Sequence, residues 1–501
     1  METNSIFEKL WPYPLELEIS DKKFDRPLTL SVSGAAIPER YFEDLKKIAN
    51  FELTDALNSY VLSFSDEAKN FGEEEYFLHI QKNAAKIISS GSAGLDRGFQ
   101  TFLQLASICF KNSNWIELKI RDKPVFKRRS FMLDMGRSIF KMSYIKRIIR
   151  IMNRLKMNTL HLHLTDDELC GIRFEGLPCG TENPYSISLS EFVEIIDYAS
   201  EYHIEIIPEI EAWGHAGGLV YHYPHLRGGE GMYKGSSFLI CEETYNLMEK
   251  IIDQLMAVMP AKHIIHLGLE EALWFPSKEL PGSYTQGDMM IRYNSILEKL
   301  ARKYNKKTTM MIFADHKPIP VPEGIKSSVI VTPWNYWNSN KEGIQKAVDY
   351  YSSQENMRWM AGAGQSGGQF RGVYHATREW CRRAKDCKNI EGIDITFWMW
   401  NNLDQNFLTI FSGAYYSWNP DSNARFSNVD DYEAFDRQVT PIMQNWQGVF
   451  EDARPDFMAK DRGPIVYAGY YFWGEKHLES VAPTAPLAGT LQAGGHDFMN
   501  E

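Results

Sequence analysis

The stretch SFMLDMGRSIFKMSYIKRIIRIMNRLKMNTLHLHL, residues 130–164, has the pattern of a strand, a helix and a second strand. Residues 130–134 and 159–164 are the two apolar runs. Between them, apolar side chains from Ile145 to Leu155 recur at the spacing of an amphipathic helix. Two buried strands joined by a crossover helix are the repeating unit of parallel α/β folds.

The same alternation continues along the chain to residue 425. Six further apolar runs are strand candidates, at residues 204–208, 264–267, 308–313, 328–332, 357–361 and 393–398. A capping box, Ser188-Leu189-Ser190-Glu191, marks the start of one intervening helix. Strands that are apolar throughout are buried on both faces, so eight such units favour a closed (β/α)8 TIM barrel over an open sheet.

Two regions of different character flank the barrel pattern of residues 126–425. Residues 1–125 predict an N-terminal α+β domain, with half-buried strands and an amphipathic helix near 97–105. Residues 426–501 predict a short C-terminal extension. We expect a helix near 435–450 and a flexible end rich in Ala, Pro and Gly.

Charge and composition limit the partners that we expect. The formal net charge is −11 and the pI is near 5.7, which argues against nucleic acid and anionic membranes because both need clustered Lys and Arg. No apolar run approaches the ~18 residues of a membrane span. The first residues lack a signal-peptide pattern, and six cysteines are scattered without a metal-type CxxC spacing. We therefore expect a cytoplasmic protein, although a trimmed secreted chain would look the same, and the oligomeric state stays open.

Residues suited to chemistry recur where the predicted strands end, which in a barrel is the end that carries the active site. These residues are Asp134, Arg137, Asp166, Asp167, Glu209, Glu211, His215, Glu270, Glu271, Asp315, Trp334, Trp398 and Trp400. The pair Glu270-Glu271 carries the most information, because two adjacent carboxylates are costly beside an apolar strand unless they are used. In many hydrolases one acid of such a pair stays protonated while the other is ionised, and the protonated one serves as a general acid at neutral pH.

Four of these strand ends resemble motifs of glycoside hydrolase family 20, the β-N-acetylhexosaminidases. The matching stretches are RSFMLDMGR (129–137), KMNTLHLHLTDD (156–167), IPEIEAWGH (207–215) and HLGLEEA (266–272), with GLDRG (94–98) in the N-terminal region. The resemblance covers residues 1 to about 420 and is specific at the first four strands. It implies an exo-acting retaining hydrolase that uses no metal or cofactor. Its substrate would be a glycan or glycoside with a terminal N-acetylhexosamine.

The resemblance also implies roles for single residues. In this family the substrate's own 2-acetamido carbonyl attacks the anomeric carbon, an exception to the usual scheme of two catalytic carboxylates. Glu271 aligns with the general acid and Glu270 with the residue that orients the acetamido group. Asp166 and His215 align with residues that hydrogen-bond toward the acid, and Arg137 with the residue that grips sugar hydroxyls.

Four further residues are candidate substrate contacts. Trp334 and Trp400 are expected to form walls around the sugar ring, since aromatic side chains stack on flat apolar faces. Plain barrel packing stays open as the alternative explanation for both. Asp315 and Tyr336 follow the fifth and sixth predicted strands and complete the candidate set.

One departure from the family pattern concerns the orienting residue. The family normally has Asp, preceded by Gly, where this chain has Glu270, preceded by Leu269. The added methylene moves the carboxylate about one bond further into the site, and a displacement of ~1 Å can cost on the order of 100-fold in rate. Altered specificity at C2, a catalytically weak carbohydrate-binding barrel, and a metal-dependent hydrolase that uses His161 and His163 therefore stay open as alternatives.

Overall fold

The structure is a computed structural model that describes residues between 6 and 454. Within these limits it leaves out residues 36, 57, 112, 139, 168–169, 182–185, 229–236, 272–283, 315–317, 337–339, 366–372, 399–402, 404–406 and 422–431. The chain divides into two compact units. Unit 1 combines the residues up to Lys127 with Arg150–Met157 and Phe411–Asp456, and unit 2 contains Arg128–Ile149 and Asn158–Ile410. The expected domain boundaries at 125 and 425 stay predictions.

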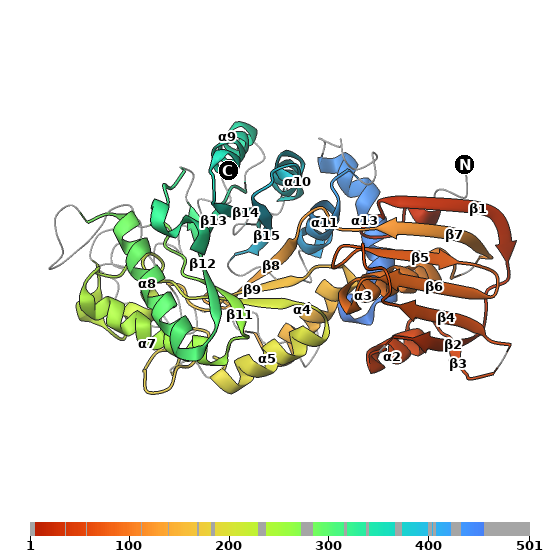
Figure 1. Ribbon diagram of the computed structural model, residues 1–501, viewed down its shortest axis with the longest axis horizontal. Coiled ribbons are helices and arrows are strands. Elements are labelled where there is room, and N and C mark those ends of the chain that lie inside the picture. Colours follow the sequence, from red (N-terminus) through yellow and green to blue (C-terminus); the bar gives the residue numbers. More distant parts are fainter. Residues whose placement is uncertain are drawn as a thin grey trace. The chain divides into compact units, whose positions relative to one another are not determined.

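Unit 1 is built on a seven-stranded mixed sheet of order β1-β7-β5-β6-β4-β2-β3. The strands are β1 (Glu16–Phe24), β2 (Thr29–Gly34), β3 (Glu52–Leu53), β4 (Tyr60–Ser65), β5 (Tyr76–Ile80), β6 (Ala84–Ser89) and β7 (Trp115–Asp122). Burial alternates strictly along β4 and β5, as it must when one sheet face is covered. The helices α2 (Glu39–Lys47) and α3 (Ser92–Gln104) follow β2 and β6 in the chain (Figure 1). The predicted N-terminal α+β fold is confirmed.

A helix from the C-terminal part of the chain also belongs to unit 1. It is α13 (Tyr432–Val449), and it confirms the helix expected near 435–450. Its buried residues Phe435, Val439 and Trp446 recur at helical spacing. The ring of Trp446 lies edge-on to the ring of Phe411, with 5.7 Å between the ring centroids.

Unit 2 is a closed barrel of eight parallel strands, β8 to β15, in chain order around the ring (Figure 1). The strands are β8 (Arg128–Asp134), β9 (Thr159–His163), β10 (Glu205–Glu209), β11 (Lys262–His266), β12 (Lys307–Ala314), β13 (Val329–Pro333), β14 (Arg358–Gln365) and β15 (Ile390–Phe397). All eight predicted strands are present, so the TIM-barrel prediction is confirmed. Closure between β15 and β8 leaves the sheet without an exposed edge.

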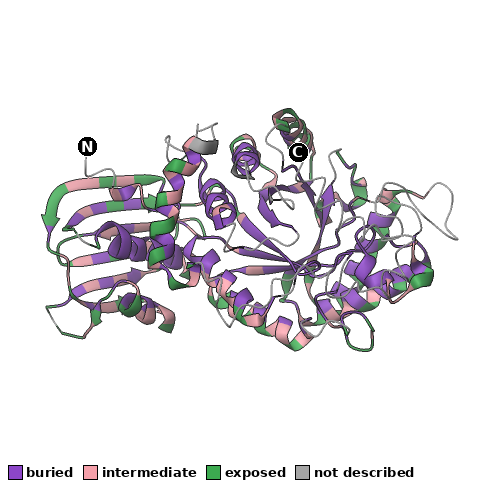
Figure 2. Ribbon diagram, turned by 180° about the vertical axis from the view of Figure 1, so that it is seen from behind, coloured by how far each residue is buried: buried purple, intermediate pink, exposed green. Residues whose placement is uncertain are grey.

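In the described part of the chain, α-helices follow seven of the eight barrel strands, two of them after β10, whereas β12 is followed by a 3-10 helix, Glu323–Ser328. The α-helices are α4 (Met142–Arg154), α5 (Leu189–Glu201), α6 (Gly217–Val220), α7 (Glu242–Val258), α8 (Gln286–Tyr304), α9 (Lys341–Ser353), α10 (Val373–Ala384) and α11 (Phe407–Trp418). The capping box at Ser188 is present, with both the side chain and the backbone of Ser188 bonded to Glu191. Figure 2 shows the barrel strands buried and the outer faces of the helices exposed.

The barrel interior changes character along the strands. An apolar layer is formed by Ile207, Ile264, Met311, Ile330 and Met360. Side chains two residues further along a strand point to the same face, and on β10 and β11 these are Glu209 and His266, both fully buried. The interior therefore becomes polar toward the C-terminal strand ends, where barrel enzymes place their chemistry.

Among the helices that the structure describes, none is both long enough and apolar enough to cross a membrane.

Candidate active site

Strand register brings the polar ends of four neighbouring strands into one layer. Asp134 pairs with His163, His163 with Glu209, and Glu209 with His266 in the ladders of β8 to β11. All four side chains are buried. The loops that leave this layer carry Arg137, Asp166, His215 and the Glu270-Glu271 pair, so the sequence-predicted residues of the first four strands come from one end of the barrel.

His215 connects an acidic pair to Glu271. Its Nε2 lies 2.9 Å from Glu271 Oε2, and its Nδ1 lies 3.0 Å from Asp167 Oδ2 and 3.4 Å from Asp166 Oδ1. Burial alone would lower the pKa of His215, but Asp166 and Asp167 outweigh burial and raise it well above the usual value. The imidazole therefore carries a proton at neutral pH and is held between carboxylates on both sides.

Arg137 holds the first of the two aspartates. Its guanidinium lies 2.7 Å from Asp166 Oδ2 and 3.2 Å from Asp134 Oδ2, and its backbone N–H donates to Asp134 at 2.9 Å. Burial raises the pKa of Asp166, but Arg137 and His215 outweigh it and hold that pKa far below the usual range. Asp166 is thus a permanent carboxylate that fixes Arg137 at the barrel mouth.

A strained turn carries the acidic pair. Gly268, Leu269 and Glu271 all have positive φ, at 64°, 68° and 52°. Residues other than glycine rarely adopt this conformation, and it costs of order 1–3 kcal/mol each where the surroundings enforce it. The turn leaves Glu270 only 6 % exposed. Such strain is found where a backbone is held for function, and here it lies in the turn that carries both acids.

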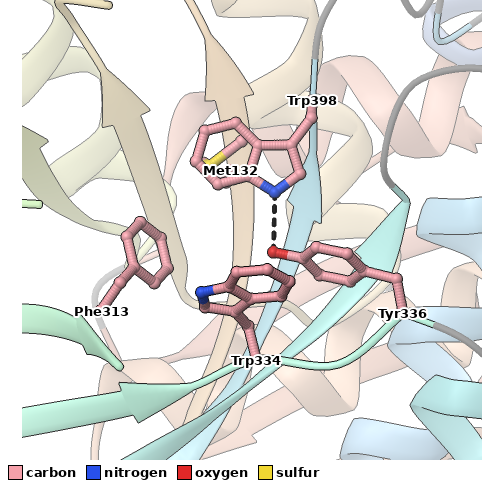
Figure 3. Close-up of a cluster of buried hydrophobic side chains, with 5 residues drawn as sticks. All are labelled: Met132, Phe313, Trp334, Tyr336 and Trp398. Atoms are coloured by element: carbon pink, nitrogen blue, oxygen red, sulfur yellow. Dashed lines mark hydrogen bonds between the residues drawn. The ribbon is translucent and has the colours of Figure 1, made fainter. Parts of the chain in front are cut away.

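Aromatic side chains from the ends of the barrel strands gather in one buried cluster, which contains Trp334, Tyr336 and Trp398 (Figure 3). The rings of Trp334 and Tyr336 stack with centroids 5.2 Å apart, and Trp398 Nε1 donates to Tyr336 Oη at 2.7 Å. The guanidinium carbon of Arg137 lies 5.6 Å from the centroid of the Trp398 ring. Burial, followed by the charge of Glu270, raises the pKa of Tyr336 well above its usual value. Tyr336 is therefore a neutral phenol close to Glu270.

A buried network of histidines and acids lies beneath this site. Nδ1 of His161 is 2.8 Å from Asp394 Oδ2, and its Nε2 is 3.0 Å from Glu209 Oε2. His163 contacts Glu209 through Nδ1 and Asp166 through Nε2, the latter at 2.6 Å. Burial lowers the pKa of His161, but Asp394 and Glu209 raise it overall to about 9. The network thus connects the centre of the barrel to Asp166.

Several of these groups consist of His, Asp and Glu, the residue types that bind metal ions. Among the described residues, donor atoms of His161, Glu209 and His266 lie within 4.8 Å of one another, as do those of Asp166, Asp167 and His215. The histidine–carboxylate contacts within the network are mostly 2.6–3.0 Å, which are hydrogen-bond lengths. Atoms that share a tetrahedral zinc at roughly 2.0–2.2 Å stand more than about 3 Å apart. The spacing is therefore that of direct ion pairs between these side chains.

The structure brings together most of the predicted site residues that it describes. Arg137, Asp166, His215 and Glu271 are joined by direct contacts, and Glu270 and Tyr336 influence each other electrostatically. Trp334 packs with Tyr336. Trp400 and Asp315 lie outside the described residues, so their placement stays a prediction.

Sequence reasoning assigned no role to three residues that the geometry places in or against the site. Asp167 lies closer to His215 than Asp166 does. Because the two aspartates are adjacent in the chain, the sequence gives no signal for which of them approaches the histidine more closely. Trp398 lies against Arg137, two residues before the Trp400 that was selected. Glu211 is fully buried. The sequence signal for its burial is an acid placed between the apolar residues Ile210 and Ala212.

Comparison with known families identifies the family of the barrel. The model of glycosyl hydrolase family 20, catalytic domain, matches residues 126–398. A β-hexosaminidase of Porphyromonas gingivalis is 30% identical over 307 residues, which are 52% of this chain and 38% of that protein. A β-hexosaminidase of Vibrio furnissii is 28% identical over 230 residues, covering 40% of this chain and 38% of that one. These matches therefore span well under two thirds of the relatives.

Solved structures share the fold at lower identity. The Flavobacterium johnsoniae chitobiase superposes with a TM-score of 0.69 at 18% identity, covering 88% of this chain and 73% of that one. A mutant Streptomyces plicatus β-hexosaminidase, solved in complex with GlcNAc, gives a TM-score of 0.66 at 19% identity, covering 92% and 98%. At these identities the likeness concerns the fold alone.

Proposed function

The chain belongs to glycosyl hydrolase family 20, and on that premise we propose that it is an exo-acting retaining β-N-acetylhexosaminidase. The substrate is a glycan or glycoside that ends in N-acetylhexosamine. The observation that carries the proposal is the chain of contacts from Asp167 through His215 to Glu271, at 3.0 and 2.9 Å. These contacts give the Glu271 carboxyl group a buried partner, His215, for proton transfer at the barrel mouth.

In the first step the carbonyl oxygen of the 2-acetamido group forms a bond to the anomeric carbon. The bond from that carbon to the leaving oxygen breaks, and Glu271 delivers its proton to this oxygen. The product is a cyclic oxazolinium ion on the sugar and a carboxylate on Glu271. Cationic His215 then donates from Nε2 to that carboxylate, so the protein stabilises the charge as it develops.

In the second step water attacks the anomeric carbon, and the carboxylate of Glu271 accepts the proton of this water. The bond to the acetamido oxygen breaks and the sugar leaves with its original configuration. Asp166 and Asp167 balance the positive charge of His215 throughout the reaction. Without them, the imidazolium beside Glu271 would favour loss of the Glu271 proton before it is needed. Two anionic partners on Nδ1 reduce this effect.

Glu270 and Tyr336 are the residues that we assign to the acetamido group. The carboxylate of Glu270 opposes the positive charge that the oxazolinium ion acquires. Tyr336 keeps its proton because burial and Glu270 raise its pKa, so its hydroxyl can donate to the acetamido oxygen. Arg137, fixed by Asp134 and Asp166, is assigned to the sugar hydroxyls.

The extra methylene of Glu270 favours one second candidate, a related glycosidase with altered specificity at C2. A carboxylate that reaches further into the pocket leaves less room for the acetamido methyl group. Aryl β-glycosides with and without the 2-acetamido group separate the two candidates. Substrate assistance requires turnover of the acetamido glycoside and inhibition by a thiazoline mimic of the oxazolinium ion. Equal rates on both glycosides would contradict it.

The assignment of Glu271 is tested by Glu271→Gln, which removes the transferable proton at nearly constant shape. We expect turnover of an aryl N-acetyl-β-hexosaminide to fall by roughly 100-fold or more, because general acid catalysis contributes about 10²–10⁴. Glu243→Gln, on the exposed start of α7, is the matched control. Wild-type turnover in the Glu271 variant, with a native melting curve, would refute the assignment.

A further inference from the structure

The turn that carries the acidic pair is held through its backbone carbonyl groups. The carbonyl of Leu267 accepts from the backbone N–H of Ala212 at 3.0 Å, and that of Gly268 accepts from the backbone N–H of Phe313 at 2.9 Å. These donors belong to the loop after β10 and to β12. Because both bonds are made by the backbone, a substitution at either donor leaves them in place unless it introduces proline.

The next carbonyl group along the turn is held by a side chain instead. Nε2 of Gln286 donates to the carbonyl oxygen of Leu269 at 3.2 Å. Leu269 has a φ of 68°, and its carbonyl belongs to the peptide bond that leads into Glu270. The peptide group is planar, so a fixed carbonyl also fixes the N–H of Glu270 and the direction in which the chain enters this residue.

The first turn of α8 keeps Gln286 in place. Thr285 caps the helix, and its hydroxyl accepts from the backbone N–H of Asp288 at 3.3 Å. The carboxylate of Asp288 in turn accepts from the backbone N–H of Thr285 at 2.8 Å. Gln286 directly follows the cap. This reciprocal capping box therefore fixes the backbone from which the side chain of Gln286 extends.

A second side chain of α8 holds the neighbouring loop. The hydroxyl of Tyr293, which is buried, donates to the carbonyl of Ala212 at 2.8 Å. Gln286 and Tyr293 are seven residues apart and so lie on one face of the helix. The two loops that this face meets are themselves joined, because Ala212 donates to Leu267. One hydrogen-bonded frame thus contains α8 and the loops after β10 and β11.

We propose that Gln286 is a positioning residue for Glu270: its side-chain amide clamps the carbonyl of Leu269 and thereby holds the Glu270 carboxylate in the orientation that the acetamido group requires. The inference rests on the proposed function, since it concerns the residue assigned to that group. A positive φ at Leu269 must be enforced by its surroundings. Without the clamp the peptide before Glu270 gains freedom to rotate, and the carboxylate is no longer oriented before the substrate arrives.

Two variants remove the donor at nearly constant size. Gln286→Leu is neutral, and Gln286→Glu keeps the shape but presents an acceptor to the carbonyl. We expect kcat on an aryl N-acetyl-β-hexosaminide to fall about tenfold in both, with little change in KM. Gln354→Leu removes an amide-to-carbonyl bond at the end of α9 and should keep the kcat of the wild type. Wild-type kcat in Gln286→Leu would overturn the proposal.

A thiazoline mimic of the oxazolinium ion separates positioning from a merely structural role. Glu270 is assigned to this ion, so a misplaced Glu270 should weaken inhibition by the mimic by about the same factor of ten as kcat. The melting temperature should stay close to that of the wild type, because Gln286 is only half-buried. A lower melting temperature with unchanged inhibition would show a role in stability alone and would overturn the proposal.

Hydrogen exchange tests the clamp without turnover. We expect the backbone amides of residues 267–271 to exchange faster in Gln286→Leu than in the wild type or in Gln354→Leu, because the turn opens more often once the bond is lost. Unchanged exchange in this segment would overturn the proposal. A wild-type enzyme that turned over no acetamido glycoside would contradict the proposed function, whereas the exchange rates would still report on Gln286.

Discussion

At the residue scale, the most specific feature of this chain is the length of Glu270, the acid that we propose orients the acetamido group. Glu270 stands where the family pattern has Asp, and Leu269 stands where it has Gly. Leu269 is fully buried at a φ of 68°, so the turn is enforced by packing as well as by backbone. The charge of Glu270 acts on Tyr336, and the carboxyl group of Glu211 packs against Gly268 at the start of the turn.

Shortening this acid is therefore expected to harm the enzyme. Glu270→Asp withdraws the carboxylate by roughly 1 Å, and we expect kcat on an aryl N-acetyl-β-hexosaminide to fall on the order of 100-fold. Glu298→Asp makes the same chemical change at an exposed position of α8 and should leave kcat unaltered. Faster turnover in Glu270→Asp would mean that the pocket is matched to Asp instead.

At the element scale, the connection after β11 determines how the acidic pair is presented. In Gly268→Ala the new methyl group meets Glu211 at 1.8 Å in a backbone conformation that disfavours alanine. We expect a loss of about 1–3 kcal/mol in the free energy of unfolding, together with reduced turnover. Gly324→Ala, where no atom lies within 4 Å, is the control. Denaturant melts of both variants measure the difference, and equal stability would contradict the tight packing of this turn.

The polar layer shared by β9, β10 and β15 predicts a loss of stability at alkaline pH. The pKa of His161 is raised to about 9 in the folded protein. The contribution of its proton to the free energy of unfolding is therefore complete below the ordinary histidine pKa of about 6.5 and is lost as the pH rises through about 9. The difference corresponds to on the order of 3 kcal/mol.

Unfolding free energies measured across this range should fall with pH in the wild type. The slope should be smaller in His161→Gln, because the variant has no proton to lose there. His225→Gln, at a side chain that is 57% exposed, should keep the wild-type slope. An unchanged slope in His161→Gln would show that His161 holds no proton that folding depends on.

At the scale of the whole molecule, unit 1 is held together by segments that are far apart in the sequence. Lys156 Nζ lies 3.0 Å from Asp122 Oδ2, with both side chains almost fully buried. Asp122 also accepts from Tyr76 Oη at 2.7 Å and from Trp418 Nε1 at 3.0 Å. One carboxylate thus joins β5, β7, the segment after α4 and α11. The N-terminal sheet and these later segments fold as parts of one unit.

Asp122→Ala should therefore destabilise unit 1 strongly. The variant leaves the charge of Lys156 buried without its partner, and breaking such a pair costs about 3–5 kcal/mol. Glu117→Ala breaks the pair between Glu117 and Lys22, whose side chain is 71% exposed, and should cost less than about 1 kcal/mol. Thermal melts of both variants provide the comparison. A melting temperature in Asp122→Ala similar to that of Glu117→Ala would contradict the role of this cluster.

The sequence by itself determined the eight strands, the barrel class and the acids at the first four strand ends, because apolar runs, helical spacing and short motifs are local properties of the chain. Only the tertiary structure decided that Asp167 approaches His215 more closely than Asp166 does, that Trp398 lies against Arg137, and that Glu211 packs under Gly268. These facts depend on strand register, on the φ angles of a turn and on burial. Such properties arise when distant segments meet, and no local pattern records them.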